Sequence, residues 1–201
     1  YEKPFLKFYR TIINHLISYP FSIKNFIQTM PHWLEDRLIL PLILKDKLGY
    51  DGKVLFIKHH LAHAASSFLV SPFNEAAIIT SDGVGEFATL TLGFGKENKI
   101  KITHELQYPN SLGLLYSTIT SYLGFQANRD EGKIMALADY GKPIYINELK
   151  DIIDIKSDGS FWINQNYFGF NKGSTMYSKK FVKRFGNPRT KNEKITQRHK
   201  D

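Results

Sequence analysis

Two short apolar runs flank a segment that is rich in histidine and alanine, and this arrangement constrains the fold more than any other part of the sequence. The first run covers residues 54–57 and the second covers residues 76–79, and both are typical of buried strands. The segment between them, residues 59–68, contains no Gly or Pro and favours a helix. Strand, helix and strand in this order predict an α/β fold.

Two histidines of the predicted helix have the spacing of metal ligands. His59 and His63 are four residues apart, so a helix places both imidazoles on one face. Asp82 follows the second apolar run, at the carboxyl end of a strand, where ligands gather in open α/β sheets. Two imidazoles and a carboxylate suit a divalent transition metal. The alternative is that the histidines are polar groups at a helix start and that Asp82 opens a turn, and the chemistry alone leaves both interpretations open.

The second apolar run leads into a glycine-rich stretch, residues 82–86, which we expect to form a turn. Residues 87–94 alternate between apolar and polar and predict a strand, and residues 100–106 predict the third strand of a β-meander. A strand after the glycines argues against a dinucleotide-binding Rossmann turn, which requires a helix there. The small residues would let backbone N–H groups approach a phosphate, but an ordinary hairpin turn explains them equally well.

A further polar cluster opens a helix later in the chain. Asp130 is the expected N-cap, and Glu131 and Lys133 lie in the first helical turn. The helix dipole disfavours a lysine at this position, so another interaction must account for the presence of Lys133. That interaction is either a salt bridge to Asp130 or Glu131, or a contact with a phosphate or acyl-phosphate ligand.

The rest of the chain divides into segments that differ in their predicted secondary structure, with no linkers between them. Residues 1–50 show helical periodicity broken by prolines and predict a helical insertion. Residues 53–141 are the α/β core with the motifs, and residues 142–201 add a helical segment with a small hairpin. Because no stretch is rich enough in Gly, Ser or Pro to mark a boundary, we interpret residues 1–201 as a single, incomplete domain.

The composition limits the types of metal ligand, the partners and the cellular location that we expect for this protein. The 201 residues include no Cys, so a metal must use nitrogen and oxygen ligands. The net charge is +8, but the basic residues are diffuse except near the end, and we do not expect nucleic acid as a partner. The longest apolar segment, residues 38–44, is far too short to span a bilayer, so we expect no membrane partner and a cytoplasmic location.

Three motifs in one order resemble the NodU/CmcH-type O-carbamoyltransferases. They are His-His-x-Ala-His-Ala-Ala-Ser from residue 59, Ser-Asp-Gly-x-Gly-Glu from residue 81, and Leu-Gly-Phe-x-x-x-x-Asp-Glu-Gly-Lys-x-Met-x-Leu-Ala-x-Tyr-Gly from residue 123. The resemblance extends from about residue 54 to the C-terminus, whereas residues 1–50 match weakly. It implies part of the N-terminal domain, with an actin-like ATPase (ribonuclease H-like) fold, a mixed sheet with a β-meander, and helical insertions.

The resemblance also implies an activity and a set of site residues. The family uses carbamoyl phosphate and ATP to form a carbamoyl-adenylate and transfers the carbamoyl group to a hydroxyl of a sugar, a nodulation factor or an antibiotic. The implied metal is iron(II), with zinc or manganese able to substitute, and its implied ligands are His59, His63 and Asp82. The implied nucleotide- and substrate-binding residues are Gly83, Gly85, Glu86, Glu131 and Lys133.

Some parts of the family pattern do not occur in this sequence. The family begins with a strand and a His-Asp motif that supplies a catalytic base, so no base is assigned here. We therefore interpret the chain as an internal fragment that is inactive alone, and we expect the complete protein to form a homodimer. Two alternatives stay open: a tRNA threonylcarbamoyl transferase-like enzyme, which shares the two-histidine metal site, and a noncatalytic nucleotide- or nucleic-acid-binding module. Salt-dependent binding to tRNA would identify the latter.

Overall fold

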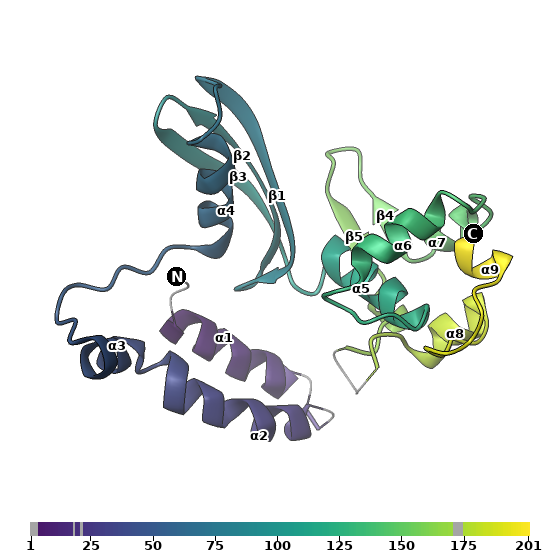
Figure 1. The fold of residues 1–201 in the computed structure, drawn as a ribbon, viewed down its shortest axis with the longest axis horizontal. Helices are drawn as coiled ribbons and strands as arrows, with labels where there is room; N and C mark the ends of the chain where they lie inside the picture. Colours follow the sequence, from purple (N-terminus) through teal and green to yellow (C-terminus); the bar gives the residue numbers. More distant parts are fainter. Residues whose placement is uncertain (1–3, 18, 21, 171–174) are drawn as a thin grey trace. The chain divides into compact units, whose positions relative to one another are not determined.

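A computed structural model of the chain has the predicted α/β architecture, with a three-stranded meander and several helices (Figure 1). The structure describes residues 4–17, 19–20, 22–170 and 175–201. The chain forms two compact units, one of Tyr1–Thr80 with Leu92–Thr103 and the other of Ser81–Thr91 with His104–Asp201. The boundary between the units falls within the three strands of the sheet, each of which is continuous across it.

The N-terminal segment is helical, as predicted, but its prolines act differently from one another. Its elements are α1 (Pro4–Ile17), α2 (Ile23–His32), the π-helix η1 (Trp33–Arg37) and α3 (Leu40–Leu48). Pro41 lies in the first turn of α3, where a missing N–H costs nothing. We expected the prolines of this segment to break its helices, but Pro31 lies inside α2. A π-turn follows α2, in which the Leu38 N–H donates to the Trp33 carbonyl at 3.0 Å.

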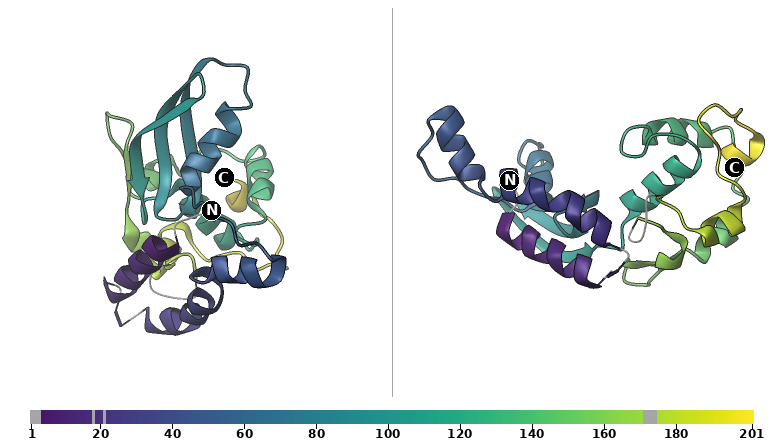
Figure 2. Two further views of the ribbon diagram at one scale, coloured as in Figure 1. Left: turned by 90° about the vertical axis from the view of Figure 1, so that its left-hand side faces the viewer. Right: turned by 90° about the horizontal axis from the view of Figure 1, so that it is seen from below.

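The first sheet is a meander with a helix packed on one face (Figure 2). Helix α4 (His59–Phe68) has the predicted bounds, and the strands are β1 (Glu75–Gly85), β2 (Ala88–Lys96) and β3 (Lys99–Gln107) in the order β1-β2-β3. Ala64 and Phe68 of α4 pack on Ile78 of β1. This contact works because Gly95 of β2 has no side chain, and a Cβ there would overlap the Phe68 ring.

Two expectations about the strands were wrong. Residues 54–57 are extended but form no strand, and the side chains of Leu55 and Ile57 are 67% and 49% exposed. An extended segment becomes a strand only when a neighbour satisfies its backbone groups, and no strand among the described residues pairs with it. The glycine-rich stretch is also not a turn, because β1 continues through it to Gly85 and the chain turns at Glu86, which has φ of 63°.

The second unit combines helices with a small hairpin. Its remaining elements are α5 (Leu112–Tyr122), α6 (Glu131–Ala138), α7 (Ile146–Lys150), β4 (Ile153–Ile155), β5 (Phe161–Ile163), the 3₁₀-helix η2 (Gln165–Tyr167), α8 (Lys179–Phe185) and α9 (Gln197–Lys200). Its apolar core consists of Tyr122, Ile152, Phe161, Ile163, Tyr167, Phe168 and Phe181. Ser111 caps α5, because its side chain accepts a hydrogen bond from the Leu114 N–H at 3.0 Å.

Two arginines hold the C-terminal segment of this unit. The guanidinium of Arg189, a residue that is 7% exposed, donates to the carbonyls of Leu123 and Glu193, each at 2.6 Å. Arg198 donates to the carbonyls of Phe185 at 2.7 Å and Asn187 at 2.8 Å. Both arginines therefore act as multivalent donors that replace regular secondary structure along this segment.

Candidate metal centre

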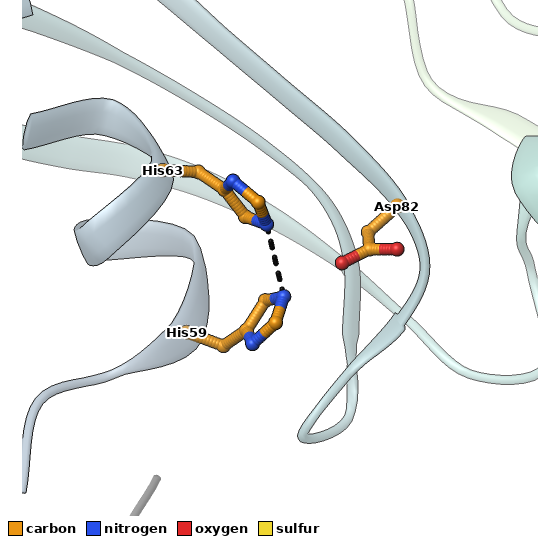
Figure 3. Close-up of side chains that lie close together, drawn as sticks. All are labelled: His59, His63 and Asp82. Atoms are coloured by element: carbon orange, nitrogen blue, oxygen red, sulfur yellow. Dashed lines mark hydrogen bonds between the residues drawn. The ribbon is translucent and has the colours of Figure 1, made fainter. Parts of the chain in front are cut away.

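The first turn of α4 presents two imidazoles side by side. His59 and His63 lie one turn apart, and their Nε2 atoms are 2.9 Å apart (Figure 3). His59 is half-buried and His63 is exposed, so both rings remain accessible. The helix forms here because the segment lacks Gly and Pro, and its i,i+4 geometry brings the two rings together.

The third histidine of the motif has a structural role. His60 is 4% exposed, and its Nδ1 lies 2.6 Å from the Oγ1 of Thr80 on β1. This buried contact fixes the start of α4 on the strand. Successive side chains of a strand alternate between faces, so Asp82 lies on the same face of β1 as Thr80, which is the face toward α4.

His59, His63 and Asp82 form a group that could hold a metal ion. One ligand atom from each residue lies within 4.8 Å of the others, and Figure 3 shows the carboxylate facing the two rings. The Gly83 N–H donates to Oδ1 of Asp82 at 2.6 Å and orients the carboxylate. Within the described part of the chain, no other set of three His, Asp or Glu side chains meets this distance criterion.

The residues of this group fit a divalent metal. Two ligand atoms that lie about 2.0–2.2 Å from one zinc ion in tetrahedral geometry are about 3.3–3.6 Å apart, so side-chain rotation must shorten the longest separation in this group by up to about 1.5 Å. The donor set of two nitrogens and one oxygen is the type that such metals accept. Metal binding itself stays a prediction, as does the identity of the ion.

A cleft of about 770 Å³ opens beside Asp82, within the second unit. Residues from β1, from the first two turns of α5 and from around the start of α6 line it, among them Asp82, Gly83, Gly113, Ser117, Asn128 and Glu131. A Cβ built on Gly83 would meet no atom within 4 Å. Packing therefore does not require a glycine at residue 83, whose backbone is open to a ligand at this point.

Two hydrogen bonds anchor Glu131 in the cleft. Its Oε1 accepts hydrogen bonds from the Ser117 hydroxyl at 2.8 Å and the Asn128 N–H at 2.6 Å. Burial acts to raise the pKa of this carboxyl, but the hydrogen bonds from Ser117, Asn128 and nearby backbone N–H groups outweigh it, and the pKa is lowered. Glu131 is therefore a carboxylate at neutral pH.

The structure places only some of the five proposed binding residues in the cleft. Gly83 and Glu131 line the cleft, whereas Gly85, Glu86 and Lys133 do not. Gly85 is buried at the end of β1, and Glu86 forms the turn. Lys133 is 63% exposed, and its Nζ lies 2.8 Å from Oδ1 of Asp130. The salt bridge considered from the sequence is thus present, and the ligand-binding roles of all five residues stay predictions.

Sequence analysis missed three residues that shape this region: Gly113, Ser117 and Asn128. Gly113 had a recognisable signal, since a glycine in the first turn of a helix costs stability and therefore suggests a close approach. A Cβ on Gly113 would lie 2.7 Å from both the Asp82 carbonyl oxygen and the Gly83 nitrogen. Ser117 and Asn128 gave no local signal, because only the folding of α5 against α6 brings them to Glu131.

The fold and this arrangement of residues define an α/β protein with a candidate metal centre beside a cleft large enough for a small molecule. The chain belongs to the family described as carbamoyltransferase N-terminus, which matches residues 4–201. The resemblance seen in the three motifs is thereby confirmed.

Curated relatives agree with this membership. An uncharacterised protein of Synechocystis sp. is 43% identical over 211 residues, which cover 100% of this chain and 34% of that protein. The nodulation protein NolNO of Sinorhizobium fredii is 33% identical over 84% of this chain and 24% of its own length. The nodulation protein NolO of Bradyrhizobium diazoefficiens is 30% identical over 72% of this chain and 25% of its own length. The chain thus spans about a third or less of the length of these relatives.

In the described part of the chain, no helix is both long enough and apolar enough to cross a membrane.

Proposed function

We propose that this chain forms the metal-binding and part of the substrate-binding region of an ATP-dependent O-carbamoyltransferase. The observation that carries the proposal is the convergence of His59, His63 and Asp82 within 4.8 Å in a chain of the carbamoyltransferase family. The proposed co-substrates are carbamoyl phosphate and ATP, which react by way of a carbamoyl-adenylate. The proposed acceptor is a hydroxylated small molecule, in keeping with the nodulation proteins among the relatives.

The proposed metal is iron(II), zinc or manganese, and when bound it would polarise an oxygen of the donor or the acceptor as a Lewis acid. The chain's own residues would prepare the site. The contact of His60 with Thr80 keeps α4 in register with β1, and the Gly83 N–H orients the Asp82 carboxylate. The open backbone at Gly83 would let the nucleotide approach the strand without a steric cost.

Metal content of purified variants tests the first part of the proposal. His63→Ala and Asp82→Asn should each lose most of the bound metal, measured by plasma mass spectrometry, because each removes one of three ligands. His32→Ala is the matched control, since the His32 side chain is 74% exposed on α2 and lies outside the ligand group. Equal metal in all of these variants would show that the histidine motif is only a polar helix start.

Product analysis tests the second part. The complete gene product, supplied with ATP, carbamoyl phosphate and a panel of hydroxylated sugars, should yield a carbamoylated sugar detectable by mass spectrometry. The same mixture with Asp82→Asn should yield little product. Salt-dependent tRNA binding without carbamoyl transfer would instead favour a nucleic-acid-binding module.

A further inference from the structure

Helix α1 exposes a row of apolar side chains that the candidate metal centre does not use. Phe5, Tyr9 and Leu16 are 72%, 62% and 68% exposed. They are spaced by four and seven residues, so at about 100° per residue they lie along one side of the helix. Ile17, which is 77% exposed, widens this row. A row of large exposed apolar side chains is uncommon on a monomeric protein unless it meets a partner.

Helices α1 and α2 pack side by side and antiparallel (Figure 1). The ring of Phe8, near the start of α1, lies 5.8 Å from the ring of Trp33, which directly follows α2. The ring of His15, near the end of α1, lies 5.3 Å from the ring of Phe26 within α2. These two contacts define the line along which the helices meet.

Helix α2 has an exposed row of its own, formed by Ile23 and Ile27, which are 50% and 65% exposed. On each helix, the exposed row lies about 90° around the axis from the line of contact, in the same rotational sense along the chain. Because the helices are antiparallel, equal rotations in one sense lead to the same side of the pair. The two rows therefore form one apolar face, which we call the α1–α2 face.

Positively charged residues border the α1–α2 face on its two outer edges. Arg10 follows Ile17 around the circumference of α1, and Lys24 follows Ile27 around the circumference of α2. Both cations thus lie on the side of their helix that is away from the other helix. Residues 4–32 contain no Asp or Glu. The face is therefore apolar at its centre and positive at its margins.

The size and the charge of the α1–α2 face favour an anionic lipid surface over a protein partner. The 14 residues of α1 are about 21 Å long, and two packed helices are about 20 Å wide, so the face covers roughly 400 Å². Each partner of a standard protein interface contributes about 800 Å². A second copy of this chain would also bring like charges together, because the face carries no carboxylate.

We propose that the α1–α2 face binds the surface of an anionic lipid bilayer. The apolar rows would enter the boundary between headgroups and acyl chains, and Arg10 and Lys24 would meet the lipid phosphates. The inference goes beyond the proposed function and does not depend on it. The sequence predicted no membrane partner because it lacks a long apolar segment, but binding at a bilayer surface requires no spanning helix.

Vesicle binding of the complete gene product tests this inference. Vesicles of phosphatidylcholine, with or without phosphatidylglycerol, would be floated on a density gradient with the protein. The protein should float with vesicles that contain phosphatidylglycerol and only weakly with phosphatidylcholine alone. Added salt should weaken the binding to the anionic vesicles, because it screens the attraction between the cations and the lipid phosphates.

Two variants separate the apolar and the charged contributions. The double variant Leu16→Ser with Ile27→Ser removes one apolar side chain from each row and should reduce the affinity for anionic vesicles about tenfold. Lys24→Gln should reduce it about fivefold and leave the weak binding to phosphatidylcholine unchanged. All three positions are exposed, so the melting temperature should stay close to that of the wild type.

Matched controls change similar residues elsewhere in the first unit. Val70→Ser removes an apolar side chain that is 80% exposed after α4, and Lys99→Gln removes an exposed cation on β3. Both variants should bind anionic vesicles as the wild type does. If the double variant does not fold, Tyr9→Ser alone tests the same face with an expected loss of about threefold.

Three results would overturn the inference. The first is a wild-type protein that binds neither type of vesicle, or binds both equally well. The second is vesicle binding that the double variant and Lys24→Gln leave unchanged. The third is a dimer in analytical ultracentrifugation that the double variant dissociates, which would assign the α1–α2 face to contact between two copies of the protein.

Discussion

The hydroxyl of Ser111 donates a hydrogen bond of 2.6 Å to the carbonyl oxygen of Gly83. Ser111 is 1% exposed. Its hydroxyl oxygen also lies 3.2 Å from the Asp82 carbonyl oxygen, and it accepts a hydrogen bond from the Leu114 N–H. One side chain thus caps α5 and ties that helix to the strand residues that carry the candidate ligand. The position of Asp82 consequently depends on α5 as well as on its own strand.

Ser111→Ala should therefore lower both the stability and the metal affinity of the chain. The loss of a cap and a buried hydrogen bond should cost about 1–3 kcal/mol of the free energy of unfolding, measured by urea titration. The control is Ser178→Ala, which removes the cap of α8, where the side chain accepts from the Phe181 N–H. Ser178→Ala should lose stability but keep its metal affinity, and equal metal binding in both variants would argue against a positioning role for Ser111.

Gly113→Ala should destabilise the protein even though alanine is the better helix former. Its Cβ would lie 2.7 Å from the backbone of Asp82 and Gly83, so α5 must shift, at a cost of about 1–3 kcal/mol. In Gly132→Ala on α6 the new Cβ meets no atom within 4 Å, so helix propensity should raise the stability by up to about 1 kcal/mol. Thermal unfolding of the two variants measures this difference, and equal behaviour would contradict the close approach at Gly113.

Gly83→Ala should show whether a ligand approaches this backbone, because the change should not disturb the packing of the protein. The added methyl group would meet no protein atom within 4 Å, so the melting temperature should stay close to that of the wild type. If a nucleotide approaches this backbone, the methyl group should weaken ATP binding, measured by calorimetry on the complete gene product. Unchanged ATP affinity would remove Gly83 from the proposed nucleotide site.

Lys133→Met should have little effect on the melting temperature, because the Lys133 side chain is 63% exposed and exposed ion pairs contribute little. If Lys133 contacts a ligand, the variant should weaken binding of nucleotide or carbamoyl phosphate. Lys156→Met is the control, because Lys156 forms an exposed ion pair with Asp154 outside the cleft. A clear drop in melting temperature with unchanged binding would assign Lys133 to the salt bridge alone.

His199 should make the second unit sensitive to acid. Burial and, after it, the neighbouring charge of Arg198 lower the pKa of this imidazole below its usual value of 6.5. The folded state therefore binds a proton less readily than the unfolded state, so the stabilising effect is complete above pH 6.5 and is lost as the pH falls through the folded pKa. Urea unfolding across this range should show less pH dependence in His199→Gln than in the wild type. His32→Gln, at an exposed histidine, should leave the pH dependence unchanged.

The sequence predicted those elements that depend on local signals. Helix α4 has the bounds set by the segment without Gly or Pro, and Ser111 caps α5 as its position suggested. Gly124, which follows the C-cap of that helix, has φ of 73°, a conformation that glycine adopts without strain. The first strand of the meander was predicted from its apolar run and the second from its alternation of apolar and polar residues.

The remaining features depend on partners distant in sequence, which a local pattern does not specify. The apolar run at residues 54–57 has the composition of a strand, but strand formation requires a pairing neighbour. The glycines after Asp82 suggested a turn, but pairing in the sheet keeps them in β1. The grouping of His59, His63 and Asp82 was predictable because helix and strand periods are regular, whereas the cleft required the fold of α5 and α6.

Strand β1 carries Thr80 and Asp82 on the same face, where the first meets His60 and the second lies with His59 and His63. A slip of β1 by one residue would turn both side chains to the opposite face of the sheet. Such a misregistered chain would retain strands and helices but would lose the ligand set. Only the correct register of β1 would therefore bind a metal ion tightly. Added metal would stabilise the correctly paired chains relative to those shifted by one residue.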